Sequence, residues 1–365
     1  MTRSSLLLLI SVIILVVLGL SMVFNTSSAE VLDRSLAKTL HHALLKQVLY
    51  AVLGAVLAVG VWFLGYREIL RLSGYFLIGG TVLLVLVFIP GIGQNINGAY
   101  RWLGIGSYSF QPSEFVKYLI PLYFINEVAK RSSPLDFKSL VILLLKLAVP
   151  IGLILIEPDN GTVAIILSGL VALFVLTKVR WIYWGMPLLV LTLLGGVVAF
   201  QMPHVHDRIR IYMHPELDLQ GKGHQPHQSK IAAGSGGVFG RGLGESMQKL
   251  DYLPEARSDY IAAIFGEEFG FVGISALIAL YMAIGYFGFS IAAKAGDLPA
   301  FYMAAVLTFL ICFQAFLNLG VVSGLLPSKG TNLPFFSQGG SSLLANFMVI
   351  CMILNIAHEQ KYAKT

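Results

Sequence analysis

The sequence predicts an all-α integral membrane protein that crosses the bilayer about ten times. Of its 365 residues, 56% are hydrophobic and only 12% are charged, whereas about a quarter of the residues of a soluble domain are charged. The apolar residues form runs of about 18 to 25 residues, long enough for a helix to cross about 30 Å of hydrocarbon. The sequence does not contain the short alternating segments of a transmembrane β-barrel.

Ten apolar runs follow one another along the chain. They predict spans near residues 6–24, 47–65, 73–92, 113–128, 139–156, 161–177, 181–201, 267–292, 298–324 and 339–357. The first run is longer than the apolar region of a typical secretory signal, so we interpret it as an uncleaved anchor. Cys312 and Cys351 lie inside apolar runs, which favours packing roles over a disulfide or a metal cluster.

The Lys and Arg residues of the short loops predict the orientation, because cytoplasmic loops carry the larger share of them. With the N-terminus inside, eleven of these residues lie in the cytoplasm: Arg3, Arg67, Arg71, Lys130, Arg131, Lys138, Lys178, Arg180, Lys294, Lys361 and Lys364. Five lie outside: Arg34, Lys38, Lys46, Arg101 and Lys329. We therefore expect one polytopic membrane domain, residues 1–365, with cytoplasmic N- and C-termini. A long extracytoplasmic loop, residues 202–266, would join spans 7 and 8.

Ionisable side chains collect near the predicted outer ends of the spans. Each costs about 2.5 to 3.5 kcal/mol on insertion scales and is therefore a functional candidate. Asp259 begins a short amphipathic segment that leads into span 8. Ser and Asp are preferred as helix N-caps, so one interpretation of Ser258 and Asp259 is capping. The other is a general base at Asp259, although a helix N-terminus and nearby cations would lower the pKa of the carboxyl and weaken it as a base.

Two more pairs of residues lie around the start of span 4. Glu114 and Lys117 are three residues apart and share one helix face, so they either pair with each other or face a ligand. Arg101 and Trp102 precede the span, and both residue types favour the membrane interface. Arg also presents a planar fork to phosphate oxygens, which makes Arg101 a candidate anion-binding residue.

The long loop contains five histidines and a glycine-rich stretch. The histidines are His204, His206, His214, His224 and His227. They fit no standard zinc spacing, so we predict no metal site. Residues 234–244 lack the Gly-Lys-Ser/Thr ending of a P-loop, and we interpret them as flexible backbone near a polar lipid headgroup. Two outer segments, 93–104 and 326–342, are dense in Gly, Asn, Pro and Ser and are expected to fold back into the protein.

Several motifs in a fixed order resemble the SEDS family (shape, elongation, division and sporulation), which includes FtsW and RodA. The motifs are Asn97-Gly-Ala-Tyr-Arg-Trp, Gln111-Pro-Ser-Glu-Phe-Val-Lys, Glu157-Pro-Asp-Asn-Gly-Thr, His224-Gln-Pro-His-Gln-Ser-Lys, Leu253-Pro-Glu-Ala-Arg-Ser-Asp-Tyr-Ile, Gly266-Glu-Glu-Phe-Gly and Ser337-Gln-Gly-Gly-Ser-Ser. The resemblance covers essentially the whole chain. Met213-His-Pro-Glu-Leu-Asp and Leu326-Pro-Ser-Lys-Gly-Thr are more similar to the division branch, FtsW, than to the elongation branch, RodA. The chain departs from the family pattern at Glu157 and Asn160, where the family has Gln and Leu, and at Gln338, where it has Tyr.

The resemblance implies the SEDS fold and a peptidoglycan glycosyltransferase that polymerises lipid II into glycan strands during septal cell-wall synthesis. A 4-hydroxyl of the acceptor would attack C1 of the donor, and undecaprenyl pyrophosphate would leave with inversion. Asp259 matches the essential aspartate of the family, and we assign it the role of general base on that hydroxyl. Such proton removal typically contributes about 10²- to 10⁴-fold to a rate.

A pyrophosphate leaving group requires positive charge around it. The residues we expect to bind substrate are Arg101, Trp102, Glu114, Lys117, Arg208, Arg210, Lys230 and Arg257. No cofactor is assigned; a divalent cation, Mg²⁺ or Mn²⁺, would neutralise the same charge, but no cage of oxygen ligands is visible in the sequence.

The resemblance also implies partners and a location. The expected partners are lipid II, a class B penicillin-binding protein as transpeptidase, other divisome proteins and the membrane, with no nucleic acid. The expected location is the cytoplasmic (inner) membrane at the division septum. Two alternatives remain: a lipid II flippase, which would use buried charges such as Lys146 and Glu157, and a non-catalytic divisome scaffold. A flippase needs a polar path to both faces, whereas the polar motifs collect at the outer side.

Overall fold

The computed structural model describes most of the chain. The described residues are 2–34, 42–96, 98–105, 108–131, 133–200, 212–219, 221, 223–249, 253, 256–327 and 330–362. The long helices are α1 (Arg3–Arg34), α2 (His42–Leu64), α3 (Tyr66–Val87), α4 (Ser113–Ala129), α5 (Phe137–Ile156), α6 (Asn160–Leu176), α7 (Trp181–Phe200), α10 (Ile261–Ala293), α11 (Leu298–Val322) and α12 (Gly340–Tyr362). Among the described residues, seven helices are long and apolar enough to cross a membrane: α1, α2, α3, α5, α10, α11 and α12. The chain is therefore a multi-pass membrane protein.

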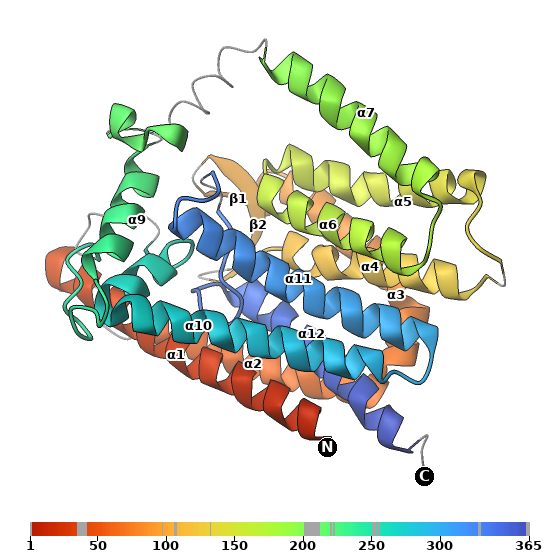
Figure 1. Cartoon of the computed structure of the whole chain (residues 1–365), viewed down its shortest axis with the longest axis horizontal. Helices are drawn as coiled ribbons and strands as arrows, with labels where there is room; N and C mark the ends of the chain where they lie inside the picture. Colours follow the sequence, from red (N-terminus) through yellow and green to blue (C-terminus); the bar gives the residue numbers. More distant parts are fainter. Residues whose placement is uncertain are drawn as a thin grey trace.

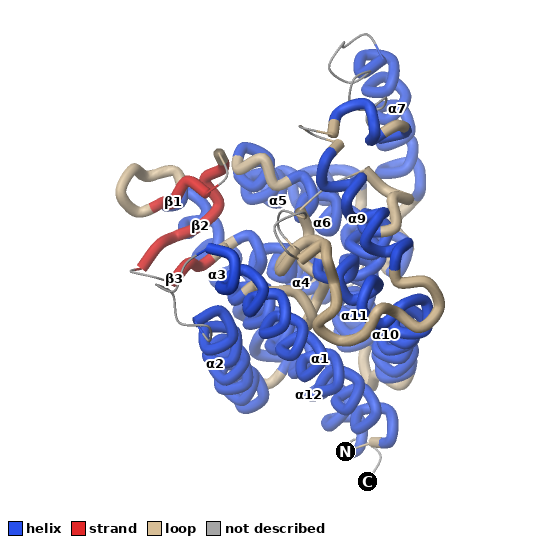
Figure 2. The backbone as a smooth tube through the Cα atoms, turned by 90° about the vertical axis from the view of Figure 1, so that its left-hand side faces the viewer, coloured by secondary structure: helices blue, strands red, loops and turns tan. Residues whose placement is uncertain are grey.

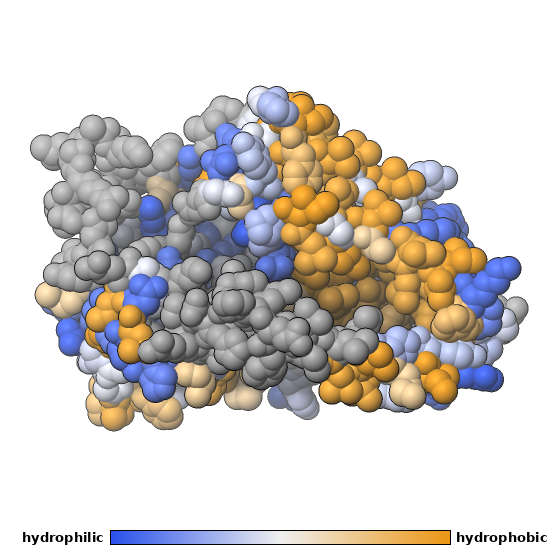
Figure 3. Space-filling view, turned by 90° about the horizontal axis from the view of Figure 1, so that it is seen from above, coloured by the Kyte–Doolittle hydropathy of each residue, from blue (hydrophilic) through white to orange (hydrophobic). Residues whose placement is uncertain are grey.

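The helices pack as a bundle with α11 and α12 near its centre (Figure 1). In their most apolar segments, 67% of α11 and 78% of α12 is buried, compared with 17% of α2. α10 packs against α1 and α11, α2 packs against α12, and α4 contacts α3, α6 and α11. Helices at the rim expose apolar side chains, such as Ile156 on α5 and Leu193 on α7. The face that carries α5, α6 and α7 is largely apolar (Figure 3), as expected of a surface in contact with lipid.

A small antiparallel sheet corrects the all-α prediction. It is formed by β1 (Gly93–Ile96), β2 (Ala99–Ile105) and β3 (Tyr108–Phe110), in the order β1-β2-β3. Gly93 pairs with Leu103, and Leu103 pairs with Phe110. The sheet lies beside the bundle, between α3 and α4 in the chain (Figure 2). The segment that was expected to fold back into the protein forms strands at the side of the bundle, and pairing between the strands satisfies their own backbone groups.

The segment between α7 and α10 is more than a connector. It contains the 3₁₀ helix η1 (Pro215–Asp218) and the helix α9 (His224–Ser235), and α9 packs against α10 and α11. In Figure 1, α9 extends from the same end of the bundle as the start of α10. Residues 201–211 lie outside the described residues, so the described part of this segment begins at residue 212.

The glycine-rich stretch after α9 is fixed to α10 at a kink. Gly270 has φ 65° and ψ −161°, which interrupts the helical backbone. Phe271 N donates to Gly237 O at 2.9 Å, and Val272 N donates to Val238 O at 3.1 Å. In the other direction, Arg241 N donates to Glu267 O at 3.0 Å. The stretch is therefore fixed rather than flexible, because its glycines allow it to pair with the backbone of α10.

We expect Gly270→Ala to destabilise the protein by about 1 to 3 kcal/mol. The φ and ψ of Gly270 fall in a region that is almost restricted to glycine, and an added Cβ would lie 2.6 Å from the carbonyl oxygen of Val238. Thermal unfolding of the purified protein in detergent would measure the loss. Gly60→Ala is the matched control, because Gly60 lies in α2 and a Cβ added there would meet nothing within 4 Å. Equal melting temperatures for the two variants would contradict the role given to the kink.

Candidate active site

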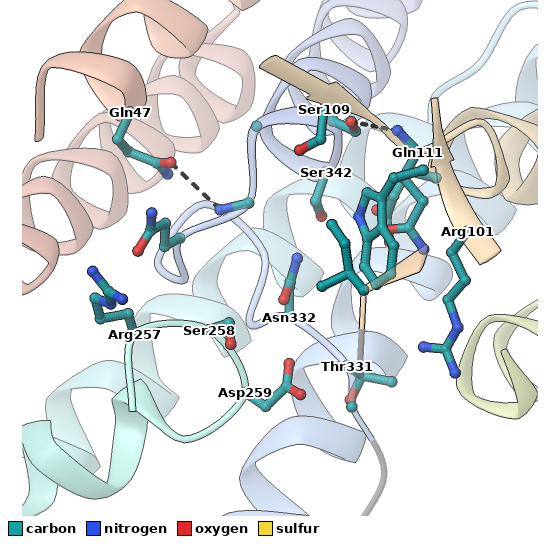
Figure 4. A pocket seen from close by; sticks show the side chains of 18 of the residues that line it. Gln47, Arg101, Ser109, Gln111, Arg257, Ser258, Asp259, Thr331, Asn332 and Ser342 are labelled. Atoms are coloured by element: carbon teal, nitrogen blue, oxygen red, sulfur yellow. Dashed lines mark hydrogen bonds between the residues drawn. The ribbon is translucent and has the colours of Figure 1, made fainter. Parts of the chain in front are cut away.

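A polar cavity of about 780 Å³ lies where the sheet, the ends of several helices and two loop segments meet. Its walls come from α2, β2, α4, α6, α11 and the start of α12, together with residues 256–259 and 330–332. The sequence-predicted residues that line it are Arg101, Trp102, Glu114, Arg257 and Asp259. Candidates from three separate parts of the chain thus share one cavity, and Figure 4 shows Arg101, Arg257 and Asp259 in it.

Asp259 lies in the turn before α10. The N-cap residue of α10 is Tyr260, so neither Ser258 nor Asp259 occupies the cap position, and the capping interpretation does not fit. Figure 4 shows the Asp259 carboxyl directed toward Asn332 and Thr331. A side chain at Gly330 would begin 2.7 Å from Oδ2 of Asp259, so the absence of a side chain there makes room for the carboxylate.

The backbone of the Asp259 turn is held from two other segments. Asn318 Nδ2, on α11, donates to the carbonyl oxygen of Asp259 at 2.8 Å and to that of Thr331 at 2.7 Å. Ser337 Oγ donates to the carbonyl oxygen of Ser258 at 2.5 Å. Gln338 N donates to the carbonyl oxygen of Arg257 at 2.9 Å. Because three successive carbonyls are fixed in this way, Asp259 is presented by a rigid turn, as a catalytic group requires.

Arg101, on β2, is anchored at the C-terminal end of α5. Its Nε donates to the carbonyl oxygen of Glu157 at 2.8 Å, and its Nη2 donates to that of Pro158 at 2.8 Å. These carbonyls follow the last turn of a helix, where cations are favoured. A guanidinium has five N–H donors, so these two bonds orient the group at the cavity wall without using all of its donors.

Glu114 and Lys117 form a buried ion pair on α4. Lys117 Nζ lies 2.6 Å from Glu114 Oε2 and 2.8 Å from Gln314 Oε1. Of the two interpretations, pairing is the one that the structure shows, and substrate binding by either residue stays a prediction. Glu114 and Gln314 line the cavity, whereas Lys117 is fully buried behind them.

The other predicted cations are distributed differently. Arg257 lines the cavity on the side opposite Arg101 in the view of Figure 4, with Asp259 between them. Lys230 is exposed and lies over Gly324, next to the end of α11, and it is not among the lining residues. Arg208 and Arg210 lie outside the described residues.

Much of the cavity wall consists of amides and hydroxyls that the sequence analysis did not name as substrate-binding residues. These residues are Gln47, Tyr50, Ser109, Gln111, Thr331, Asn332, Gln338, Ser341 and Ser342. Two of their bonds are drawn in Figure 4: Gly339 N donates to Gln47 Oε1 at 3.4 Å, and Gln111 N donates to Ser341 Oγ at 2.8 Å. The Gly-, Asn- and Ser-rich composition of the outer segments was the available signal. Lys46 also lines the cavity, but at the start of an apolar run it looked like an ordinary flanking lysine.

Two carboxyls between α5 and α6, those of Glu157 and Asp159, differ in their surroundings. Asp159 accepts from Thr162 N at 3.1 Å, from Thr162 Oγ1 at 2.8 Å and from Gln111 Nε2 at 3.2 Å. Glu157 has 0% exposure, and no described residue hydrogen-bonds either oxygen of its carboxyl. Burial, with a smaller contribution from the Asp159 charge, raises the pKa of Glu157 to about 8, although Arg101 opposes the shift. Glu157 is therefore mostly protonated at pH 7, and Asp159 is the hydrogen-bonded member of the two.

The described residues do not form a metal cage. Within the described ranges, no three His, Cys, Asp or Glu side chains come together to hold an ion. His204 and His206 lie outside those ranges. The carboxylate of Asp159 accepts hydrogen bonds from Gln111 and Thr162. No chemical step below depends on a divalent cation.

Comparison with known proteins places the chain in a family. The family model FTSW_RODA_SPOVE, described as "Cell cycle protein", matches residues 5–362. The chain is 37% identical over 366 residues to the "Probable peptidoglycan glycosyltransferase FtsW" of Alcanivorax borkumensis, and the alignment covers 98% of this chain and 94% of that one.

Two solved structures are similar over nearly the full length. The crystal structure of the rod shape determining protein RodA of Thermus thermophilus matches with a TM-score of 0.68 and 26% identity, over 97% of this chain and 96% of that one. A chain of the structure described as "Structural coordination of polymerization and crosslinking by a peptidoglycan synthase complex" matches with a TM-score of 0.79 and 24% identity, over 97% of each chain. At that identity the second likeness shows the fold alone. The chain belongs to the FtsW, RodA and SpoVE family of cell cycle proteins.

Proposed function

We propose that the protein is a peptidoglycan glycosyltransferase that polymerises lipid II during septal synthesis. The observation that carries the proposal is the Asp259 carboxylate, which a rigid turn presents in a polar cavity that Arg101 also lines. Family membership and the name of the relative at 37% identity support it. The amide and hydroxyl lining suits a saccharide, because such groups can both donate to and accept from sugar hydroxyls.

In the proposed reaction Asp259 accepts the proton of the acceptor's 4-hydroxyl as the oxygen attacks C1 of the donor. The bond from C1 to the pyrophosphate oxygen breaks, and undecaprenyl pyrophosphate leaves from the opposite face with inversion. Negative charge develops on the leaving oxygen, and a preorganised cation there lowers the barrier. We assign this role first to Arg101, because two backbone carbonyls hold its guanidinium in place.

We propose supporting roles for the remaining candidates. Arg257 lines the opposite wall and is proposed to contact the other saccharide, and Trp102 offers a ring face to a sugar. The ion pair of Glu114 and Lys117 is proposed to support the floor of the cavity through Gln314. Lys230, Arg208 and Arg210 stay predictions as cations for the pyrophosphate.

We further propose the topology that the loop charges favour. The chain would be a single polytopic domain, residues 1–365, with ten spans, cytoplasmic termini and the segment 202–266 outside the cell membrane. This arrangement in the inner membrane opens the cavity toward the outer leaflet, where lipid II is polymerised. A class B penicillin-binding protein would crosslink the product, together with other divisome proteins at the septum.

Polymerisation of lipid II by the purified protein tests the proposal. We expect glycan strands to form, and adding the transpeptidase partner to a parallel reaction would show whether the partner activates the enzyme. A second arm places the protein in vesicles and follows the accessibility of lipid II headgroups. Headgroup translocation without polymer in either reaction would favour a flippase, and neither activity would favour a scaffold.

A further inference from the structure

Glu157 has a buried carboxyl to which the proposed mechanism gives no role. Its side chain has 0% exposure, no described residue bonds to its carboxyl oxygens, and its own backbone carbonyl is held by Arg101 at 2.8 Å. A buried charge without a partner is strongly disfavoured, and such a group keeps its proton instead. The carboxyl therefore stays neutral, although the Arg101 guanidinium bonds to the backbone carbonyl of the same residue and favours its ionisation.

Two charged groups act on Glu157. Asp159, at the start of α6, disfavours its ionisation, and Arg101, on β2, favours it. α4 also packs against α5, and it contributes Glu114 and Lys117, which are paired with each other. The protonation state of Glu157 thus depends on burial, on one neighbouring anion and on the guanidinium that lines the cavity.

We propose that Glu157 is a positioning residue whose neutral form leaves Arg101 directed at the pyrophosphate of the substrate, and whose ionisation withdraws Arg101. A carboxylate is a better acceptor than a backbone carbonyl, because hydrogen bonds to ionised groups are roughly twice as strong. When Glu157 loses its proton, it competes with both backbone carbonyls and substrate for the same guanidinium. This inference rests on the proposed function for the identity of the anion.

The expected signature is a rise in KM for lipid II at alkaline pH with little change in kcat. If only the protonated form binds, the competent fraction falls tenfold per pH unit above the pKa, and the apparent KM rises by up to about tenfold per unit. Burial raises the pKa of Glu157 to about 8, so the rise should begin there. A group with a purely structural role would change melting temperature rather than the pH profile of KM.

Glu157→Gln provides the test, because glutamine has nearly the same shape and does not ionise. Lipid II polymerisation should be followed between about pH 6.5 and about pH 9.5, a range that brackets the transition. We expect the parent and Glu157→Gln to have equal KM at pH 7, and only the parent to show the alkaline rise. Glu216→Gln is the matched control: Glu216 is an exposed glutamate of η1 outside the cavity, and the pH profile of this variant should follow the parent.

Two further measurements test the positioning role of Glu157. If Glu157→Gln does not fold, Arg101→Met should show a high KM at every pH with no additional alkaline rise, because the group through which Glu157 acts is gone. Binding of lipid II to Asp259→Asn protein, with and without Glu157→Gln, separates this inference from the proposed function, because it needs no turnover. A parent that binds but does not polymerise would contradict only the proposed function. The same pH dependence of binding in both proteins, or a several-fold higher KM for Glu157→Gln at pH 7, would overturn the positioning role.

Discussion

Asp259→Asn is expected to lower the rate of lipid II polymerisation by about 10²- to 10⁴-fold, the usual contribution of a general base. Asparagine has the same size but cannot accept the proton of the attacking hydroxyl. The turn should keep its shape, because Asn318, Ser337 and Gln338 bond to its backbone carbonyls, which the substitution does not change. The melting temperature should therefore stay close to that of the parent while kcat falls.

Asp136→Asn is the control for this experiment. Asp136 is the N-cap residue of α5, is exposed and lies outside the cavity, and asparagine is an equally good residue at that position. Its rate should equal that of the parent. If Asp259→Asn polymerises lipid II as fast as Asp136→Asn, the assignment of Asp259 as the base is wrong, even if the protein is a glycosyltransferase.

Lys117→Met is expected to destabilise the protein by about 3 to 5 kcal/mol, because it leaves the Glu114 carboxylate buried without its cation. The two side chains are only 1% and 8% exposed, so solvent cannot replace the lost partner. Thermal or chemical unfolding in detergent would measure the change. The double variant Glu114→Gln with Lys117→Met should recover most of the loss, because it removes both charges together.

The exposed pair of Lys130 and Glu127 gives the comparison. Its side chains are 59% and 21% exposed, and pairs of this kind contribute about 0 to 1 kcal/mol. Lys130→Met should therefore change stability little. A loss as small for Lys117→Met would mean that Glu114 takes up a proton or finds water, and the ion pair would then not support the cavity floor.

The sequence predicted the helices well where an apolar run of sufficient length specifies a spanning helix by itself. Predicted span 298–324 corresponds to α11 (Leu298–Val322), and 139–156 corresponds to α5 (Phe137–Ile156). Hydropathy failed at some ends. Span 73–92 was predicted to continue past Val87, where α3 ends. Ile89 and Ile92 kept the segment apolar, but Pro90 disfavours helix in the residue before it, and Gly91 adopts φ 87°.

The sequence did not predict the small sheet, because its strands depend on contacts with one another rather than on local sequence. The composition of residues 93–104 marked the segment as more than a connector, yet strand pairing depends on partners. Tyr108 to Phe110 are too few residues to show a period, and they become a strand only because β2 lies beside them. Secondary structure of this kind depends on a neighbour rather than on the segment itself.

The sequence by itself determined that the chain crosses a membrane repeatedly, and that polar and ionisable residues gather near one set of helix ends. Both follow from local chemistry, because a helix in lipid satisfies its own backbone and an apolar run of sufficient length specifies it. The identity of Asp259 as a candidate came from its motif, and so did the roles first given to the cations.

Only the tertiary structure decided which of these residues meet. Asn318 lies 59 residues from Asp259, and Ser337 lies 79 residues from Ser258, yet their hydrogen bonds hold the Asp259 turn. From the sequence alone, Asn318 cannot be told from the packing residues of its apolar run. Lys230 is as suitable a phosphate ligand as Arg101 on the same basis. Their roles separate because hydrogen bonds and burial depend on distance in space, and the order of residues along the chain does not give that distance until the helices have packed.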